Sequence, residues 1–297
     1  MGLGQAQRNP VFAILLGWLI YLIGLGLLFP AFVWVLASGS GIPWSAVQEL
    51  LSGRFEAVPA GDLLFRVMQG AHQLLSWGLA GWVLWQIVRA SESQQPAQWL
   101  PLSLAVLLVV AATPVASWLY IEVGDGWPPL WRSWLDPLQD QDSQSRDMLG
   151  RLLAPRRIST FVMNIVVFAA LPALCEELFF RGFLQKQLMR LVAPQIAVWV
   201  TAVLFSLAHL QLLGFFSRAL LGVLLGYAYL RTRTLWSSIA AHFAFNALSI
   251  VIIQQWGGSI ARFPLWGVAL SAAAVICLLI VLFRFTKPSY PASEPNI

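Results

Sequence analysis

Residues 171–181 read LPALCEELFFR, an apolar run that carries two adjacent glutamates, Glu176 and Glu177, and then Arg181. An ionisable side chain at membrane depth costs at least about 2.5–3.5 kcal/mol on insertion scales, so its presence needs a compensating reason. Such side chains are functional-site candidates by default, and we expect their partners on neighbouring helices. Two of the three histidines, His209 and His242, lie downstream in apolar segments.

The composition of the whole chain is that of an integral membrane protein. Of its 297 residues, 59% are hydrophobic and only 10% are charged, whereas soluble domains are about 25% charged. The formal charge is +5, and the sequence has no cluster of basic residues interleaved with aromatic residues. We therefore expect the basic residues to contact membrane lipids, and we expect no nucleic-acid binding. The fifteen tryptophans are typical of bilayer interfaces and lipid-facing surfaces. We place the protein in a bacterial inner (plasma) membrane.

A helix that spans a membrane needs about 20 mostly apolar residues. This criterion predicts an all-α, polytopic bundle of about eight transmembrane helices. The predicted spans are 11–37, 63–89, 99–121, 158–175, 194–213, 217–231, 235–255 and 264–285. The amphipathic segment 178–191 either continues the fourth span or lies along the membrane interface.

Polar segments divide the chain into three predicted regions. Residues 1–150 form an N-terminal region with three spans, and residues 122–157, which contain nearly half of the acidic residues, form a polar extramembrane loop at its end. Residues 158–256 form a core that carries the motifs described next. Residues 257–297 form a final transmembrane helix and a short polar tail.

The spacing of the charged residues in the opening stretch assigns them different roles. On a helix, Glu177 and Arg181 stand at positions i and i+4 and can pair on one face, while Glu176 points about 100° away. Arg181 can therefore neutralise one carboxylate and leave the other free as a general base. Pro172 cannot donate to the carbonyl oxygen of Phe168, so we expect a kink just upstream.

Two further pairs share a helix face at the same spacing, Phe205 with His209 and His242 with Asn246. Phe205 is expected to shape the wall of a pocket. Carboxylate, imidazole and amide groups could bind a metal ion with an open position for water. The same groups could also work without metal, with a glutamate and a histidine activating water while the other two side chains stabilise an oxyanion. The spacing leaves both mechanisms open.

At these residues the chain resembles the CPBP (CAAX protease and bacteriocin-processing) family, also called the Abi family, of intramembrane endopeptidases. That family includes the type II CAAX prenyl endopeptidases. Its motifs E-E-x-x-x-R, F-x-x-x-H and H-x-x-x-N all occur here in order, inside predicted spans and without a departure at any motif position. The resemblance covers roughly residues 158–256, about a third of the chain, and residues 1–150 lie outside it.

The resemblance implies a protease that cleaves a peptide bond of a membrane-associated protein or peptide. By the same resemblance, Glu176 is the base that activates water, His209 is its partner, and His242 and Asn246 stabilise an oxyanion or bind metal. These four residues, Glu176, His209, His242 and Asn246, are also the candidate ligands of zinc, and a metal-free glutamate mechanism stays open beside the metal one.

Glu177 and Arg181 are implied to be a supporting pair that fixes the helix or receives the polar end of the substrate. Structural interpretations compete with these roles, because an i, i+4 salt bridge can be purely architectural and Asn246 can serve as a helix–helix hydrogen-bonding residue. At the level of function, the alternative is a non-proteolytic membrane scaffold or immunity-type factor that retains the protease fold. A transporter or proton relay is a weaker alternative, because paired discontinuous spans are lacking in the two halves.

Overall fold

The computed structural model describes residues 9–89, 98–125, 129–154, 157–211, 214–255 and 262–286. Within these ranges the secondary structure is helical and contains no strand, which confirms the predicted all-α membrane bundle. Five described helices are long and apolar enough to cross a membrane, so the predicted count of eight is not confirmed. These helices are Pro10–Gly39, Trp99–Glu122, Ile158–Leu188, Leu235–Gln255 and Leu265–Phe285.

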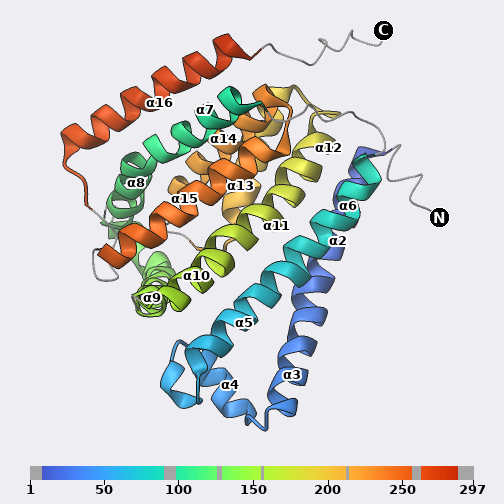
Figure 1. Ribbon diagram of the computed structural model, residues 1–297, viewed down its shortest axis with the longest axis vertical. Helices are drawn as coiled ribbons and strands as arrows, with labels where there is room; N and C mark the ends of the chain where they lie inside the picture. The colour runs from blue at the N-terminus through green and yellow to red at the C-terminus, as the bar shows by residue number, and fades with distance from the viewer. Residues whose placement is uncertain are drawn as a thin grey trace.

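Two antiparallel rods form the N-terminal part and lie along one side of the bundle (Figure 1). The first rod joins α2 (Pro10–Ile23), a π-helical turn η1 (Gly24–Leu28) and α3 (Phe29–Gly39). It begins where the side chain of Asn9 accepts hydrogen bonds from the first free backbone N–H groups, a favourable N-cap. The second rod joins α5 (Gly61–Gln73), the π turn η3 (Leu74–Gly78) and α6 (Leu79–Arg89).

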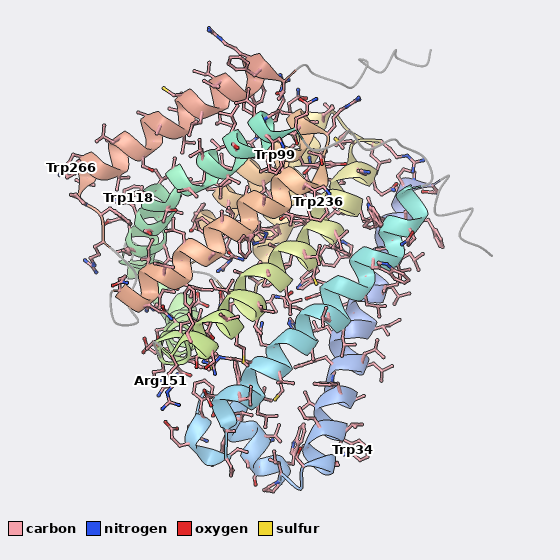
Figure 2. The ribbon with its side chains drawn as sticks, viewed as in Figure 1. Trp34, Trp99, Trp118, Arg151, Trp236 and Trp266 are labelled. Atoms are coloured by element: carbon pink, nitrogen blue, oxygen red, sulfur yellow. The ribbon has the colours of Figure 1, made fainter. Side chains whose placement is uncertain are left out.

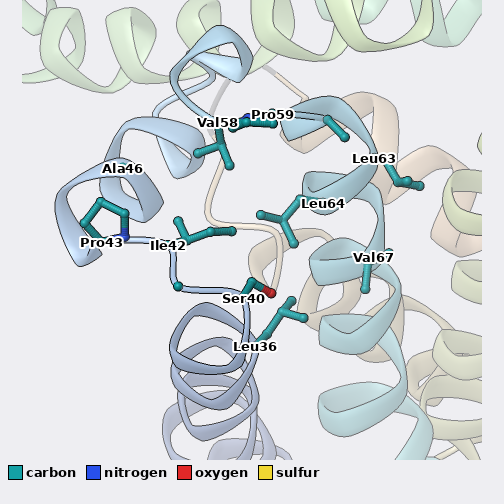
Figure 3. A pocket seen from close by; sticks show the side chains of 12 residues that line it. Leu36, Ser40, Ile42, Pro43, Ala46, Val58, Pro59, Leu63, Leu64 and Val67 are labelled. Atoms are coloured by element: carbon teal, nitrogen blue, oxygen red, sulfur yellow. The ribbon is translucent and has the colours of Figure 1, made fainter.

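A short connection joins the two rods through α4 (Trp44–Leu51) and the 3₁₀ turn η2 (Phe55–Ala57). It encloses a pocket of about 610 Å³ together with the end of α3 and the start of α5. Figure 3 shows the lining side chains Leu36, Ile42 and Leu64, which are apolar. The pocket is therefore an apolar hollow at one end of the N-terminal rods.

The middle of the chain contains α7 (Trp99–Ala111), α8 (Thr113–Asp125) and α9 (Pro129–Leu153). Helix α9 occupies most of the region predicted as a polar loop, so that region is largely helical. Its C-terminal end is held by the buried Arg66 of α5, whose Nη2 donates to the carbonyl oxygen of Leu152 at 2.7 Å. The Nε of Arg66 also donates to Oδ1 of Asn164 at 2.8 Å. One guanidinium thus joins the N-terminal rods to α9 and to the helix that follows.

The C-terminal part is built around one continuous helix, Ile158–Leu188, that runs through the middle of Figure 1. Its parts are α10 (Ile158–Ile165), the π turn η4 (Val166–Ala170), α11 (Leu171–Phe179), the π turn η5 (Phe180–Gln185) and α12 (Lys186–Leu188). The amphipathic segment 178–191 therefore continues the fourth span as far as Leu188, which resolves the two readings left open by the sequence.

Four further helices follow this central helix. They are α13 (Pro194–Leu207), α14 (Phe215–Thr232), α15 (Leu235–Gln255) and α16 (Leu265–Phe285). Helices α13 and α14 pack closely because a Cβ added to Gly222 would lie only 2.9 Å from the Cα of Ala202. Small residues at such positions let helix backbones approach in membranes. Helix α16 lies at the outer edge of the bundle (Figure 1).

The tryptophans divide between the surface and the core. Figure 2 shows Trp34 and Trp266 at the outer edge, and they are 64% and 70% exposed, as expected for lipid-facing residues. Trp77, in contrast, is buried and stacks on Tyr21 of α2 with ring centroids 3.8 Å apart. It also contacts Phe179 of α11 edge to face at 5.2 Å. The prediction that the tryptophans face lipid is therefore wrong for Trp77, which helps to join the N-terminal rods to the central helix.

Candidate active site

The two glutamates lie on α11 between the two π turns of the central helix. The turn η4 ends directly before Leu171 and Pro172, so the helix is distorted where the missing N–H of Pro172 predicts a kink. Both side chains are buried, with Glu176 4% exposed and Glu177 fully enclosed. Single π turns in membrane and soluble helices are found frequently at functional sites.

Glu177 is the centre of a buried ionic network. Its Oε1 accepts a hydrogen bond from Nη1 of Arg181 at 2.6 Å, which confirms the predicted i, i+4 pair. The same oxygen lies 2.9 Å from Nδ1 of His242 on α15. All three side chains are at most 3% exposed. Glu177 therefore holds two groups at once, the guanidinium of its own helix and an imidazole from another.

The π turn η5 aligns the polar residues that face α14. Its i→i+5 hydrogen bonds give roughly 4.4 residues per turn, so four residues rotate the chain by about 30° less than a full turn. In an α-helix four residues rotate the chain by more than a full turn, and the two deviations offset each other. Glu177, Arg181 and Gln185 consequently stay on one face. Arg181 donates from Nη2 to the carbonyl oxygen of Gly222 at 2.9 Å, and Gln185 donates to that of Gly226 at 3.1 Å.

Phe205 brings the three sequence motifs together. Its buried ring lies 4.9 Å from Cζ of Arg181, 5.1 Å from the ring of His209 and 5.8 Å from the ring of His242. The contact with Arg181 is a cation–π interaction, and the two histidine contacts are edge to face. The role of Phe205 as a pocket wall stays a prediction, and these contacts show that its ring lies against a residue from each motif.

His209 lies in the turn that follows α13 and is half-buried. Its Nδ1 is 2.9 Å from the backbone carbonyl oxygen of Phe205, one helical turn earlier. A carbonyl oxygen only accepts hydrogen bonds, so Nδ1 carries the proton of the neutral ring. The lone pair of His209 is therefore on Nε2. A neutral His242 has the same tautomer, because its Nδ1 donates to the Glu177 carboxylate.

Glu176 has a partner that the sequence motifs do not contain. The Nε2 of Gln73, at the end of α5, donates to Oε1 of Glu176 at 3.2 Å. Gln73 is 6% exposed and lies outside the region of family resemblance. The signal that could have identified it is weak, an amide within the predicted span 63–89. Within the described ranges, Glu176 makes its hydrogen bond to this amide, while His209 bonds to the carbonyl oxygen of Phe205 and His242 to Glu177; the predicted partnership of Glu176 with His209 stays a prediction.

Asn246 lies one turn after His242 on α15 and is half-buried. Its side chain makes no hydrogen bond to any residue in the part of the chain that the structure describes. The amide is therefore available to a ligand at the same helix face as His242. Of the predicted site residues, Glu177, Arg181, Phe205, His209 and His242 are joined by direct contacts, whereas Glu176 and Asn246 are not linked to that group by a hydrogen bond.

The fit of zinc to the predicted ligands Glu176, His209, His242 and Asn246 is incomplete. Both histidines have the outer-shell partner that metal ligands usually have, a carboxylate for His242 and a backbone carbonyl for His209. Among the described residues, however, no three His, Cys, Asp or Glu side chains gather closely enough to hold a metal ion. Zinc binding therefore stays a prediction, and no chemical step is derived through a metal ion.

Comparison with known proteins finds a similarity to one family in the part of the chain that holds these motifs. Residues 158–248 match the model of the family described as type II CAAX prenyl endopeptidase Rce1-like. The match confirms the predicted resemblance, and it extends from α10 into α15 and includes every motif residue. It supports a CAAX-type intramembrane protease in a lipid environment with a protein or peptide substrate. Comparisons with curated proteins and with solved structures gave no significant match.

Proposed function

We propose that this protein is an intramembrane endopeptidase that hydrolyses a peptide bond of a membrane-associated protein or peptide with water activated by Glu176. One observation carries the proposal. The segment that matches the endopeptidase family folds so that the ring of Phe205 contacts Arg181, His209 and His242, one residue from each of the three motifs. Its location in a bacterial inner membrane stays a prediction.

In this proposal Glu176 accepts one proton from a water molecule, and the resulting hydroxide oxygen forms a bond to the carbonyl carbon of the substrate. The Nε2 lone pair of His209 accepts a hydrogen bond from the same water and orients it. The electron pair of the carbonyl double bond moves to the carbonyl oxygen. When the tetrahedral intermediate collapses, the C–N bond breaks and the proton on Glu176 passes to the departing nitrogen, so that one water is consumed for each bond cleaved.

The oxyanion is stabilised by N–H donors of His242 and Asn246. In the neutral form His242 has no proton on Nε2, so it donates to the oxyanion only as an imidazolium. Glu177 supports the imidazolium through Nδ1, in the way that a buried carboxylate orients the histidine of a catalytic triad. Arg181 holds Glu177 in the ionised state for this task.

The test is cleavage by the purified full-length protein in proteoliposomes. The substrate probe is a farnesylated CAAX-type peptide, compared with the same peptide without the prenyl group. Mass spectrometry follows the released C-terminal fragment. We expect wild type to cleave, and Glu176→Gln and His209→Ala to lose cleavage while retaining the fold. The matched control is Glu49→Gln, which removes an exposed carboxylate on α4 and should cleave at the wild-type rate.

Two other outcomes would contradict the proposed mechanism or favour a different function. Equal rates for wild type and Glu176→Gln on a verified substrate contradict the proposed mechanism. A cellular phenotype that is fully complemented by Glu176→Gln favours the non-proteolytic scaffold or immunity-type factor. Comparative proteomics of strains carrying wild type or Glu176→Gln identifies natural substrates, and metal analysis of the same purified protein decides between zinc-assisted and metal-free attack.

A further inference from the structure

The N-terminal rods supply one side chain to the proposed active site. Gln73, the last residue of α5, donates its amide hydrogen bond to Glu176 across 103 positions of sequence. Its own Oε1 is buried and has no hydrogen-bond partner among the described residues. Among the described residues, no hydrogen bond joins Gln73 or Glu176 to Glu177, Arg181 or His242, so the carboxylate proposed as the base has its own hydrogen-bond donor.

Close packing fixes the distance between Gln73 and α11. A Cβ added to Gly78 would lie 3.0 Å from Sγ of Cys175, and a Cβ added to Gly81 would lie 2.9 Å from the backbone nitrogen of Phe179. The absence of side chains at both glycines therefore lets the second rod approach the helix that carries the glutamates. The wide turn η3 begins directly after Gln73, so the amide sits where the rod departs from regular α-helical geometry.

The energetics of Gln73 are those of a functional residue rather than of a packing residue. A buried amide with one unpaired oxygen costs free energy compared with an apolar side chain of the same shape. Its single hydrogen bond at this site goes to a carboxylate, and hydrogen bonds to charged groups are stronger than those between neutral groups. The amide thus stabilises the ionised form of one side chain at the expense of general stability, a pattern expected at functional sites.

We propose that Gln73 is a positioning residue for the reaction: its amide holds Oε1 of Glu176 so that the second carboxylate oxygen faces the attacking water. This inference rests on the proposed function and extends the functional unit beyond residues 158–248. It means that the N-terminal rods complete the active site as well as anchoring the protein in the membrane.

The experiment compares Gln73→Met with Gln69→Met in the proteoliposome cleavage assay. Methionine fills a similar volume without hydrogen-bonding atoms. Gln69 lies one turn earlier on α5 and is half-buried, and it makes no hydrogen bond within the described part of the chain. We expect Gln73→Met to lower kcat by roughly tenfold to a hundredfold with unchanged KM, the size of a lost hydrogen bond to a charged group. Gln69→Met should keep the wild-type kcat.

Two further measurements separate positioning from structural support. Gln73→Met should still fold and unfold cooperatively, at a lower denaturant concentration than wild type, because Oε1 of the buried Glu176 loses its donor. In a Glu176→Gln background, it should cause no additional loss of rate, because Gln73 acts through that carboxylate. If Gln73→Met does not fold, Gln73→Asn decides instead, since it withdraws the amide by one methylene: a lower kcat at unchanged KM supports the proposal, and a wild-type kcat overturns it.

A wild-type kcat in Gln73→Met, or a raised KM with unchanged kcat, overturns the inference. An equal loss in Gln69→Met also overturns it, because any polar change on α5 would then have the same effect. Failure of the proposed function is seen separately, as equal rates in wild type and Glu176→Gln, and it removes the basis for this inference as well.

Discussion

The adjacent glutamates should respond in opposite ways to the same substitution. Glutamine keeps the shape of the side chain and removes its charge. At Glu177 this change leaves the guanidinium of Arg181 buried without its carboxylate, beside the carbonyl oxygen of Gly222 at 2.9 Å and the ring of Phe205 at 4.9 Å. At Glu176 it removes a buried charge whose hydrogen bond is to the neutral amide of Gln73. The two positions are therefore matched controls for each other.

The magnitude follows from the pairing. Removing one partner of a buried ion pair costs about 3–5 kcal/mol, because the remaining charge is uncompensated. Since glutamine retains an acceptor oxygen, we expect Glu177→Gln to lose about 3 kcal/mol, the lower end of that range. Glu176→Gln should be neutral or slightly stabilising, because a neutral amide is less costly to bury than a carboxylate.

The assay is an SDS titration of each purified variant in mixed micelles, which gives the free energy of unfolding. Cleavage is measured in parallel in proteoliposomes. Both variants should be slow. Glu176→Gln lacks the proposed base, and Glu177→Gln lacks the carboxylate that supports His242, a change that costs about 10⁴-fold in kcat in a catalytic triad. We therefore expect both variants to lose activity, but only Glu177→Gln to lose stability.

The reasoning would be refuted by equal losses of stability in the two variants, or by a larger loss in Glu176→Gln. It would also fail if Glu177→Gln lost less than about 1 kcal/mol, because a surface-like ion pair contributes no more than that. Normal cleavage by Glu177→Gln would show that His242 needs no carboxylate at Nδ1.

Three other changes test the fold and the site. Arg66→Met should lose roughly 3 kcal/mol of unfolding free energy, because its charged hydrogen bonds hold α9 and α10; the exposed Arg54→Met should change it by less than about 0.5 kcal/mol. Gly222→Ala should lose about 1–3 kcal/mol, because its Cβ would lie 2.9 Å from Ala202 Cα. Gly267→Ala, whose nearest neighbour would be 3.7 Å away, is its control. Asn246→Ala should lower kcat roughly 10²- to 10³-fold if the amide donates to an oxyanion, while the fold keeps its stability to within about 0.6 kcal/mol.

Each of these predictions has a contradicting result. Equal stability of Arg66→Met and Arg54→Met would mean that the buried guanidinium does not join the two parts of the chain. Equal stability of the two glycine variants would mean that α13 and α14 adjust at no cost. A normal kcat in Asn246→Ala would leave the oxyanion to other donors, and an unfolded Asn246→Ala would make its role architectural.

Local spacing was sufficient to predict part of the site. The i, i+4 rule fixed the contact between Glu177 and Arg181, because both residues lie on one helix and their separation follows from helical geometry. The same rule placed Phe205 beside His209. The all-helical membrane bundle follows from composition and from the lengths of the apolar runs, since backbone groups in lipid must be satisfied internally.

Contacts between helices could not be predicted in this way. The partner of His242 depends on how α15 rotates against α11, and no local pattern encodes that rotation. The contact of Gln73 with Glu176 depends on the approach of the second N-terminal rod, which two glycines permit. The π turns were also unforeseen, because they arise where tertiary packing absorbs an extra residue in the helix. The predicted number of eight spans is not confirmed, since five of the described helices meet the length and hydropathy criteria for crossing a membrane.

The long-range hydrogen bonds of α5 also have a consequence for biosynthesis. Arg66 and Gln73 are synthesised 98 and 103 residues before their partners Asn164 and Glu176. A nascent chain therefore carries the donors before it carries the carboxylate that one of them supports. In our proposal, cleavage begins only after the later helices have inserted and docked against the earlier ones. If the proposal holds, the order of elements along the chain keeps the partly synthesised protein inactive in the membrane.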